Sequence, residues 1–249
     1  LGDSTDLAFS VWDGTAPFNV TLNDGTADSY WLMDNNGTVN GLPVTISPNN
    51  STTYSLVEAT DANGCWSALN GDATITIHYL PTALISGTTT ICEDEDALIT
   101  FTLQNGLPPY NVNYNINGVA TSNSFSNSGI NTIMVNPSTT TVYSLVDITD
   151  ANNCFNTASD SATIDVNEKV DAIISGGGAI CNDGSQVTID ISMNDSTIVN
   201  VTYTNGFNPI TLSGVGPFEI ITNQAGVYMI TDVVDIYGCV GTYSGNATI

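Results

Sequence analysis

One short segment occurs three times in this chain, and each occurrence ends in a cysteine. Residues 54–65 read YSLVEATDANGC, residues 143–154 read YSLVDITDANNC, and residues 228–239 read YMITDVVDIYGC. The copies are spaced by roughly 85 to 90 residues, which is the length of one small domain. The sequence therefore predicts a tandem array of three domains. Such an array builds length or repeats a surface, and is not an obvious way to build one active site.

The chain has enough apolar residues to bury a core in each domain, but almost no positive charge. Of its 249 residues 41% are hydrophobic, 25 are acidic, and only Lys169 is basic among Lys and Arg. Salt bridges therefore cannot organise the fold, and nucleic acid is nearly excluded because its phosphates need several basic partners. Anionic membrane surfaces and acidic substrates are disfavoured for the same reason. Cations, neutral sugars and basic proteins remain, and the acidic surface also keeps a long protein soluble.

No stretch of the sequence is long and apolar enough for a membrane-spanning helix. The first residues, LGDSTDLAFS, have neither the basic start nor the apolar core of a signal peptide. We therefore expect no membrane insertion in this segment, and we expect any export signal or anchor to lie outside it.

Short segments of alternating apolar and polar residues predict an all-β fold. They are separated by turns rich in Gly, Asn, Ser and Pro, and no segment shows a convincing helical period. This pattern predicts tandem immunoglobulin-like β-sandwich domains at residues 1–80, 81–168 and 169–249. In the middle domain the expected strands are residues 83–86, 97–103, 110–116, 131–135, 141–149 and 161–166.

The five cysteines fall at two positions of the repeat. The early position holds Cys92 in ISGTTTIC and Cys181 in ISGGGAIC, and the late position holds Cys65, Cys154 and Cys239. Pairing within each domain predicts the disulfides Cys92–Cys154 and Cys181–Cys239. Each would close a loop worth roughly 4 kcal/mol in the chain-entropy model. Disulfides imply an oxidising, extracellular setting.

Cys65 has no early cysteine in its own domain. The segment NGLPPYNV at 105–112 matches DGTAPFNV at 13–20, and the same offset places the expected partner of Cys65 just before Leu1. We therefore expect a segment of a longer protein that starts just inside a domain, unless Cys65 is a free thiol or forms an intermolecular bridge. A thiol–metal site is disfavoured because the sequence has no CxxC and one histidine, His78.

Acidic and amide side chains recur just before the late cysteine. They are Asp61, Asn63, Asp150, Asn152 and Asp235. Calcium takes six to eight oxygen ligands, whereas each of these loops supplies only a few side-chain oxygens. The favoured interpretation is that the aspartate caps a tight turn by accepting bonds from nearby backbone amides. Calcium binding stays as the alternative, and no other cofactor is expected.

The densest acidic run is residues 93–96, EDED. We expect it near the boundary with the first domain. A cation held there by Glu93 and Asp94 would stiffen the array, and a solvated loop is the simpler interpretation.

A catalytic function has little support, and we expect no enzyme. One histidine cannot supply a Ser-His-Asp relay in each domain. No spacing singles out a pair of carboxylates for glycoside hydrolysis. Trp31, Trp66 and Phe155 are candidates for stacking on sugars, although core packing is the usual role of such residues.

The string Y-S-L-V-x-x-T-D-A-N-[GN]-C, followed by small polar residues and an A-T-I-x-[IV] strand, resembles the repeats of Bacteroidetes cell-surface adhesins. These repeats are PKD-like or immunoglobulin-like modules of gliding-motility adhesins exported by type IX secretion. The resemblance covers all three domains, and the third departs from it with the corner D-I-Y-G-C. It implies a secreted or surface-attached fibre without catalytic residues. It also implies O-glycosylation at Ser4, Ser161 and Ser196.

The sequence thus predicts a structural or adhesive segment of a long extracellular cell-surface fibre, which spaces or presents a distal binding region. The expected partners are neighbouring domains of the same parent chain, together with surface glycans or other cell-surface proteins. Two alternatives stay open. One is a module that binds cations or carbohydrate, and the other is a subunit of a self-assembling extracellular filament.

Overall fold

The computed structural model describes residues 4–10, 13–36, 38–39, 42–194 and 196–249. All regular elements in this part of the chain are β-strands, so the all-β prediction is confirmed. The described residues include no helix that is long and apolar enough to cross a membrane. The chain divides into two compact units, residues 1–80 and residues 81–249. The position expected just before Leu1 lies outside the described residues.

The first sandwich is formed by residues 1–80. One of its sheets pairs β1 with β4, and the other has the order β3-β2-β5-β6, with β7 also paired to β5. The strands are β1 (Thr5–Leu7), β2 (Phe18–Asn23), β3 (Asp28–Met33), β4 (Val44–Ile46), β5 (Thr52–Thr60), β6 (Trp66–Ala68) and β7 (Asp72–Ile75). Its buried core is small and consists of Leu7, Phe18, Val20, Leu22, Met33 and Val44.

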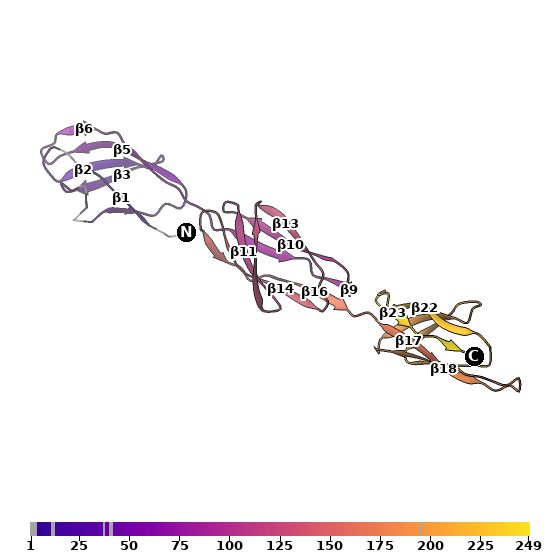
Figure 1. The fold of residues 1–249 in the computed structure, drawn as a ribbon. Helices are drawn as coiled ribbons and strands as arrows, with labels where there is room; N and C mark the ends of the chain where they lie inside the picture. The colour runs from indigo at the N-terminus through magenta and orange to yellow at the C-terminus, as the bar shows by residue number, and fades with distance from the viewer. Residues whose placement is uncertain (1–3, 11–12, 37, 40–41, 195) are drawn as a thin grey trace. The chain divides into compact units, whose positions relative to one another are not determined.

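The second sandwich opens the unit 81–249 and has the largest core. One sheet has the order β13-β10-β8, and the other has the order β12-β11-β14-β16-β9, with β15 paired to β14 (Figure 1). The strands are β8 (Thr82–Ser86), β9 (Thr89–Cys92), β10 (Ala97–Gln104), β11 (Tyr110–Ile116), β12 (Val119–Phe125), β13 (Gly129–Val135), β14 (Thr141–Thr149), β15 (Phe155–Thr157) and β16 (Ser161–Asn167). Every second side chain of β10, including Ile99, Phe101 and Leu103, is buried between the sheets, as the period of two predicts.

The third sandwich completes the same unit. Its sheets have the orders β21-β18-β17-β23 and β20-β19-β22-β24. The strands are β17 (Asp171–Gly176), β18 (Val187–Met193), β19 (Ile198–Thr204), β20 (Ile210–Val215), β21 (Phe218–Thr222), β22 (Val227–Asp235), β23 (Thr242–Ser244) and β24 (Ala247–Thr248). Each of the two sandwiches has its own cluster of buried apolar residues. The domain boundaries of the sequence stay a prediction. The structure is nonetheless that of tandem immunoglobulin-like β-sandwiches.

The I-S-G sequence before the early cysteine marks a change of sheet. In the second sandwich β8 pairs with β10, whereas β9 pairs in parallel with β16 of the opposite sheet. Gly87 lies between β8 and β9 at φ +121°, and a Cβ there would lie 2.3 Å from the carbonyl oxygen of Leu98. Glycine is therefore required at this bend. The bend carries Cys92 across to the C-terminal end of β16, opposite Asn167.

Candidate functional site

One disulfide is present among the described residues, and it joins the second sandwich to the third. Cys92 ends β9, Cys239 lies in the loop after β22, and their Cα atoms are 5.5 Å apart. The two residues are separated by 147 positions in the sequence. Cys65, Cys154 and Cys181 are free thiols. The bond therefore ties consecutive sandwiches together instead of stapling one sandwich.

The predicted pair Cys92–Cys154 is wrong because its members lie at opposite ends of the second sandwich. In β16, Ile164 pairs with Thr141 at the start of β14, and Cys92 lies opposite the residue that ends β16. Cys154 follows the other end of β14, after Thr149. A strand of nine residues spans roughly 25 Å. A disulfide needs Cα atoms within about 7 Å of each other.

The predicted pair Cys181–Cys239 is wrong for the same reason. Gly177 bridges to Thr248, which pairs with Val227 at the start of β22, and Cys181 lies further along the chain from Gly177. Cys239 follows the opposite end of β22, a strand of nine residues and roughly 25 Å. The early cysteine thus lies at one end of each of these sandwiches, and the late cysteine lies at the other.

The linker beside the disulfide is held by the acidic run. The backbone N–H of Lys169 donates to Glu93 Oε2 at 3.4 Å, and its Nζ donates to Asp94 Oδ2 at 2.8 Å. The bond to Asp94 raises the pKa of the Lys169 ammonium. On the other side of Lys169, Val170 is fully buried in the core of the third sandwich. The one Lys or Arg side chain of the sequence thus helps to fix the passage from the second sandwich to the third.

The acidic run does not lie at the boundary with the first domain, where the sequence pattern predicts it. The sheet change at Gly87 moves residues 93–96 away from the boundary with the first domain and places them at the junction with the third sandwich. The Asp94 carboxylate is paired with the ammonium of Lys169, which supplies a positive charge beside it. Among the residues that the structure describes, no cluster of three or more His, Cys, Asp or Glu side chains is arranged to hold a metal ion.

The repeated aspartate anchors the loop that presents each late cysteine. We call this loop, residues 61–65, 150–154 and 235–239, the cysteine corner. In the first corner, Asp61 Oδ1 accepts from the backbone N–H groups of Asn63 at 2.9 Å and Cys65 at 2.8 Å. Its Oδ2 accepts from the N–H of Thr15 at 3.1 Å. These bonds, the one from Cys65 first, hold the pKa of Asp61 below its usual value.

The second corner repeats this geometry and is connected to the turn at Asn105 and Gly106, which begins the segment NGLPPYNV. Asp150 Oδ1 accepts from the N–H groups of Asn152 and Cys154, each at 2.9 Å, and Oδ2 accepts from the N–H of Leu107 at 2.9 Å. A Cβ on Gly106 would lie 2.7 Å from Asp150 Oδ2, so the turn needs glycine to approach the carboxylate. The two recurring motifs of the sequence are therefore parts of one hydrogen-bonded unit.

The third corner holds the bonded cysteine in the same way. Asp235 Oδ1 accepts from the N–H groups of Tyr237 and Cys239, each at 2.8 Å. In all three corners the carboxylate accepts from at least two backbone N–H groups of its own loop, as a turn anchor does. This arrangement supports the turn interpretation over calcium ligation, because calcium needs converging oxygens.

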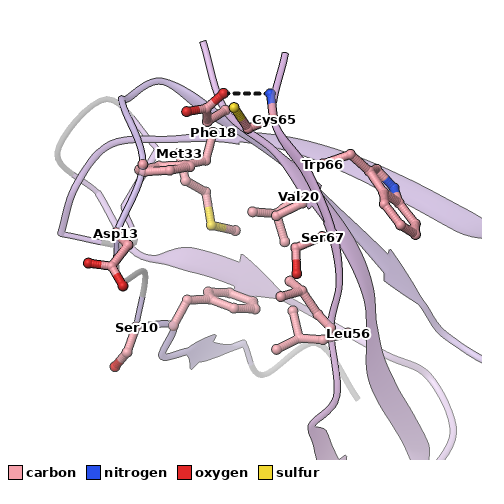
Figure 2. Close-up of a pocket in the computed structure, with 14 residues that line it drawn as sticks. Ser10, Asp13, Phe18, Val20, Met33, Leu56, Cys65, Trp66 and Ser67 are labelled. Atoms are coloured by element: carbon pink, nitrogen blue, oxygen red, sulfur yellow. Dashed lines mark hydrogen bonds between the residues drawn. The ribbon is translucent and has the colours of Figure 1, made fainter. Parts of the chain in front are cut away.

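An apolar cavity of about 370 Å³ opens in the first sandwich beside its cysteine corner. The side chains of Val20 and Met33 face each other across this space (Figure 2). Ala59 also lines it and pairs with Val20, as Ile148 pairs with Val112 in the second sandwich. Ile148 is fully buried. The cavity therefore coincides with a small side chain at the position that a buried isoleucine fills in the second sandwich.

The aromatic candidates for sugar stacking differ in exposure. Trp66 is exposed, and its indole N–H donates to Glu58 Oε2 at 2.8 Å. Phe155 is exposed at the equivalent position of the second sandwich. Trp31 packs against the core of the first sandwich. Stacking on sugars stays a prediction for the two exposed residues.

The serines predicted to be glycosylated are accessible. Ser4, Ser161 and Ser196 are all exposed, as attachment of a glycan to the hydroxyl requires. Their modification stays a prediction.

Neither a protein-family model nor a curated protein matches the sequence. Among solved structures, the fibronectin(III)-like modules of CbhA from Clostridium thermocellum match with a TM-score of 0.30 and 16% identity, over 68% of this chain and 94% of that chain. The mouse nectin-like molecule 4 ectodomain matches with a TM-score of 0.38 and 9% identity, over 99% of this chain and 92% of that chain. The four N-terminal Ig domains of Dscam1 isoform 8.4 match with a TM-score of 0.33 and 9% identity, over 93% of this chain and 65% of that chain.

Proposed function

We propose that the chain is a load-bearing structural segment of an extracellular, surface-attached fibre, in which it spaces or presents a distal binding region. The observation that carries this proposal is the Cys92–Cys239 disulfide, because it joins one sandwich to the next. A bond placed to stabilise single domains would lie inside each of them. Disulfides persist in oxidising, extracellular settings. The resemblance of the repeats to Bacteroidetes surface adhesins, with their type IX export, agrees with this setting.

The disulfide gives the segment a specific mechanical property. When the two ends of the chain are pulled, tension reaches Cys92 and passes through the S–S bond to Cys239. The residues between them, which form most of the second and third sandwiches, then carry no extending force. The Asp235 carboxylate and the Lys169–Asp94 pair hold the two sides of this link in place. The two sandwiches therefore stay at a fixed covalent length even if one of them unfolds.

The rest of the molecule fits a spacer better than a catalyst. Its net charge of −24 gives it a strongly solvated surface that repels other acidic surfaces. Its recurring polar residues are used as turn anchors, as in the three cysteine corners. Partners are accordingly neighbouring domains of the parent chain, with surface glycans or surface proteins contacted at the distal region.

Single-molecule force spectroscopy on the full chain, held at its two ends, tests this function. Unfolding in a non-reducing buffer should leave the residues between Cys92 and Cys239 unextended. Reductant should then release them and add roughly 500 Å of chain, from 147 residues at about 3.5 Å each. The Cys92→Ser/Cys239→Ser variant is the matched control and should extend fully in both buffers. An equal extension of the native chain with and without reductant would contradict the proposal.

Surface placement needs a separate measurement. An antibody against the chain should label intact, unpermeabilised cells of the source organism. Label that appears only after permeabilisation would rule out the fibre, whatever the force measurement gives.

A further inference from the structure

We propose that Cys65 and Cys181 are complementary halves of an interchain disulfide that links copies of this chain head to tail. The proposed function concerns load within one chain, whereas this inference concerns a covalent bond between chains. It stands on a separate observation, which is that each free thiol has a bonded counterpart at the Cys92–Cys239 junction.

Cys181 is the counterpart of Cys92. Both follow the I-S-G bend after the first strand of their sandwich. In the third sandwich Gly177 bridges in parallel to Thr248 of the last strand, as β9 runs parallel to β16 in the second. The chain therefore carries Cys181 to the far end of the third sandwich, as it carries Cys92 to the far end of the second. The Cys181 side chain is exposed there. It borders a hollow of about 210 Å³, which leaves room for a partner.

Cys65 is the counterpart of Cys239. The N–H of Cys65 donates to Asp61 Oδ1 at 2.8 Å, and the N–H of Cys239 donates to Asp235 Oδ1 at 2.8 Å. The backbone N–H of each aspartate in turn donates to the carbonyl of its cysteine, at 3.0 Å for Asp61 and 3.1 Å for Asp235. The two cysteines therefore have the same local backbone. They differ in that Cys239 is 1% exposed and disulfide-bonded, whereas Cys65 is exposed. Cys65 thus lies in a corner with the backbone geometry of the bonded Cys239, but its own thiol is free and exposed.

The third free thiol, Cys154, is a weaker candidate for this bond. It is half-buried, and burial together with the neighbouring Asp150 carboxylate raises the pKa of its thiol. A raised pKa lowers the fraction of thiolate, which is the reactive form. Cys65 and Cys181 are both exposed. Each copy therefore offers one late and one early cysteine, and such a heterologous contact builds an open chain of copies unless it closes into a ring.

The bond forms by thiol–disulfide exchange with a small-molecule disulfide such as oxidised glutathione. The Cys181 thiolate attacks one glutathione sulfur, forms a mixed disulfide and releases one glutathione thiolate. The Cys65 thiolate of a second copy then attacks the Cys181 sulfur and releases the other glutathione. Two protein thiols are oxidised to one disulfide. One oxidised glutathione is reduced to two thiols, which take up the two protons.

The test is the full chain at high concentration in a glutathione redox buffer, followed by non-reducing gel electrophoresis. We expect a ladder of dimers, trimers and longer species that collapses to the monomer on reduction. The variants Cys65→Ser and Cys181→Ser should each stay monomeric alone. Their equimolar mixture should give dimers and nothing longer, because each variant keeps one complementary thiol. Cys154→Ser is the matched control and should give the full ladder.

Three results would overturn the inference. One is a chain that stays monomeric with three thiols still reactive toward N-ethylmaleimide. The second is a ladder or dimer from Cys65→Ser or Cys181→Ser alone, which would mean a symmetric bond or a bond through Cys154. The third is a monomer in which Cys65 and Cys181 are already joined. Each variant is first checked for the Cys92–Cys239 bond by mass, so that a misfolded variant is recognised and replaced by the alanine variant. The force measurement depends on Cys92–Cys239 alone, so the two proposals fail separately.

Discussion

The first and second sandwiches have the same cysteine corner but different cores behind it. In both, a corner aspartate accepts from three backbone N–H groups, including one from the turn that precedes β2 in the first sandwich and β11 in the second. Yet the first sandwich has an apolar cavity of about 370 Å³ where Ala59 replaces the buried Ile148 of the second. A repeated motif therefore reproduces a loop faithfully, while packing depends on single side chains that differ within the motif.

The largest expected effect comes from removing the side chain that distinguishes the two cores. Ile148→Ala should destabilise the second sandwich by about 3 kcal/mol, because it leaves a cavity in place of a fully buried side chain. Far-UV circular dichroism during urea unfolding measures this loss. Tryptophan fluorescence should not change in midpoint, because all three tryptophans lie in residues 1–80. An unchanged circular-dichroism curve would mean that the two cores are packed alike.

The reciprocal change is the matched control. Ala59→Ile adds apolar side chain to the existing cavity and should stabilise the first sandwich by about 1 kcal/mol. The measurement is the urea midpoint by tryptophan fluorescence. A lower midpoint would show that the cavity cannot accept the larger residue and that the comparison of the two positions is incorrect.

The next effect concerns the corner that the two sandwiches share. Asp150 is 4% exposed, so Asp150→Ala leaves its N–H donors without an acceptor and should cost about 2 kcal/mol. Asp61 is more exposed, and water can replace it, so Asp61→Ala should cost clearly less. Urea unfolding of the two variants gives the comparison. Equal losses of stability in the two variants would mean that the burial of the aspartate does not determine how much its hydrogen bonds stabilise the fold.

The smallest effect is a pH dependence of the first sandwich. Hydrogen bonds from the Thr26 hydroxyl and from the backbone N–H groups of Ala27 and Thr26 lower the pKa of Asp24 to about 2. Hydrogen bonds also lower the pKa values of the Asp34 and Asp61 carboxyl groups. A lowered pKa in the folded state contributes stability above the unfolded value of 3.8. That contribution is lost as the pH falls through about 2.

Tryptophan-detected urea midpoints between pH 5 and pH 2 measure this dependence. Asp24→Asn should flatten the lower part of the curve, and Asp72→Asn serves as a control at an exposed position. Two results would contradict the lowered pKa of Asp24. One is a urea midpoint of the unmodified protein that stays constant from pH 5 to pH 2, and the other is the same pH dependence in Asp24→Asn as in the unmodified protein.

Much of the fold was accessible from the sequence. The six strands predicted for the second sandwich correspond to β8, β10, β11, β13, β14 and β16, because their inward side chains alternate. The missed strands lacked that signal. β12, VATSNSF, is an edge strand with mostly small polar side chains, and β9 and β15 are short. The turn role of the corner aspartate was also accessible, since its bonds are local.

The disulfide was not accessible from repeat positions alone. Pairing an early with a late cysteine inside one domain assumes that the two lie at the same end of a sandwich. The sheet change at Gly87 places Cys92 at the far end instead, and this follows only from the parallel pairing of β9 with β16. The location of the acidic run was misjudged for the same reason. The size of the first core depended on Ala59, a difference inside an otherwise matching motif.

Cleavage at a single site tests the central claim that Cys92–Cys239 joins the second sandwich to the third. Trypsin can cut only after Lys169, the one Lys or Arg of the sequence. The free thiols are blocked with N-ethylmaleimide, the chain is unfolded in urea and cut, and its mass is measured without and with reductant. The disulfide predicts one covalent species before reduction, and two pieces, residues 1–169 and 170–249, after it. Two separate pieces without reductant, as pairing within each domain requires, would contradict the account.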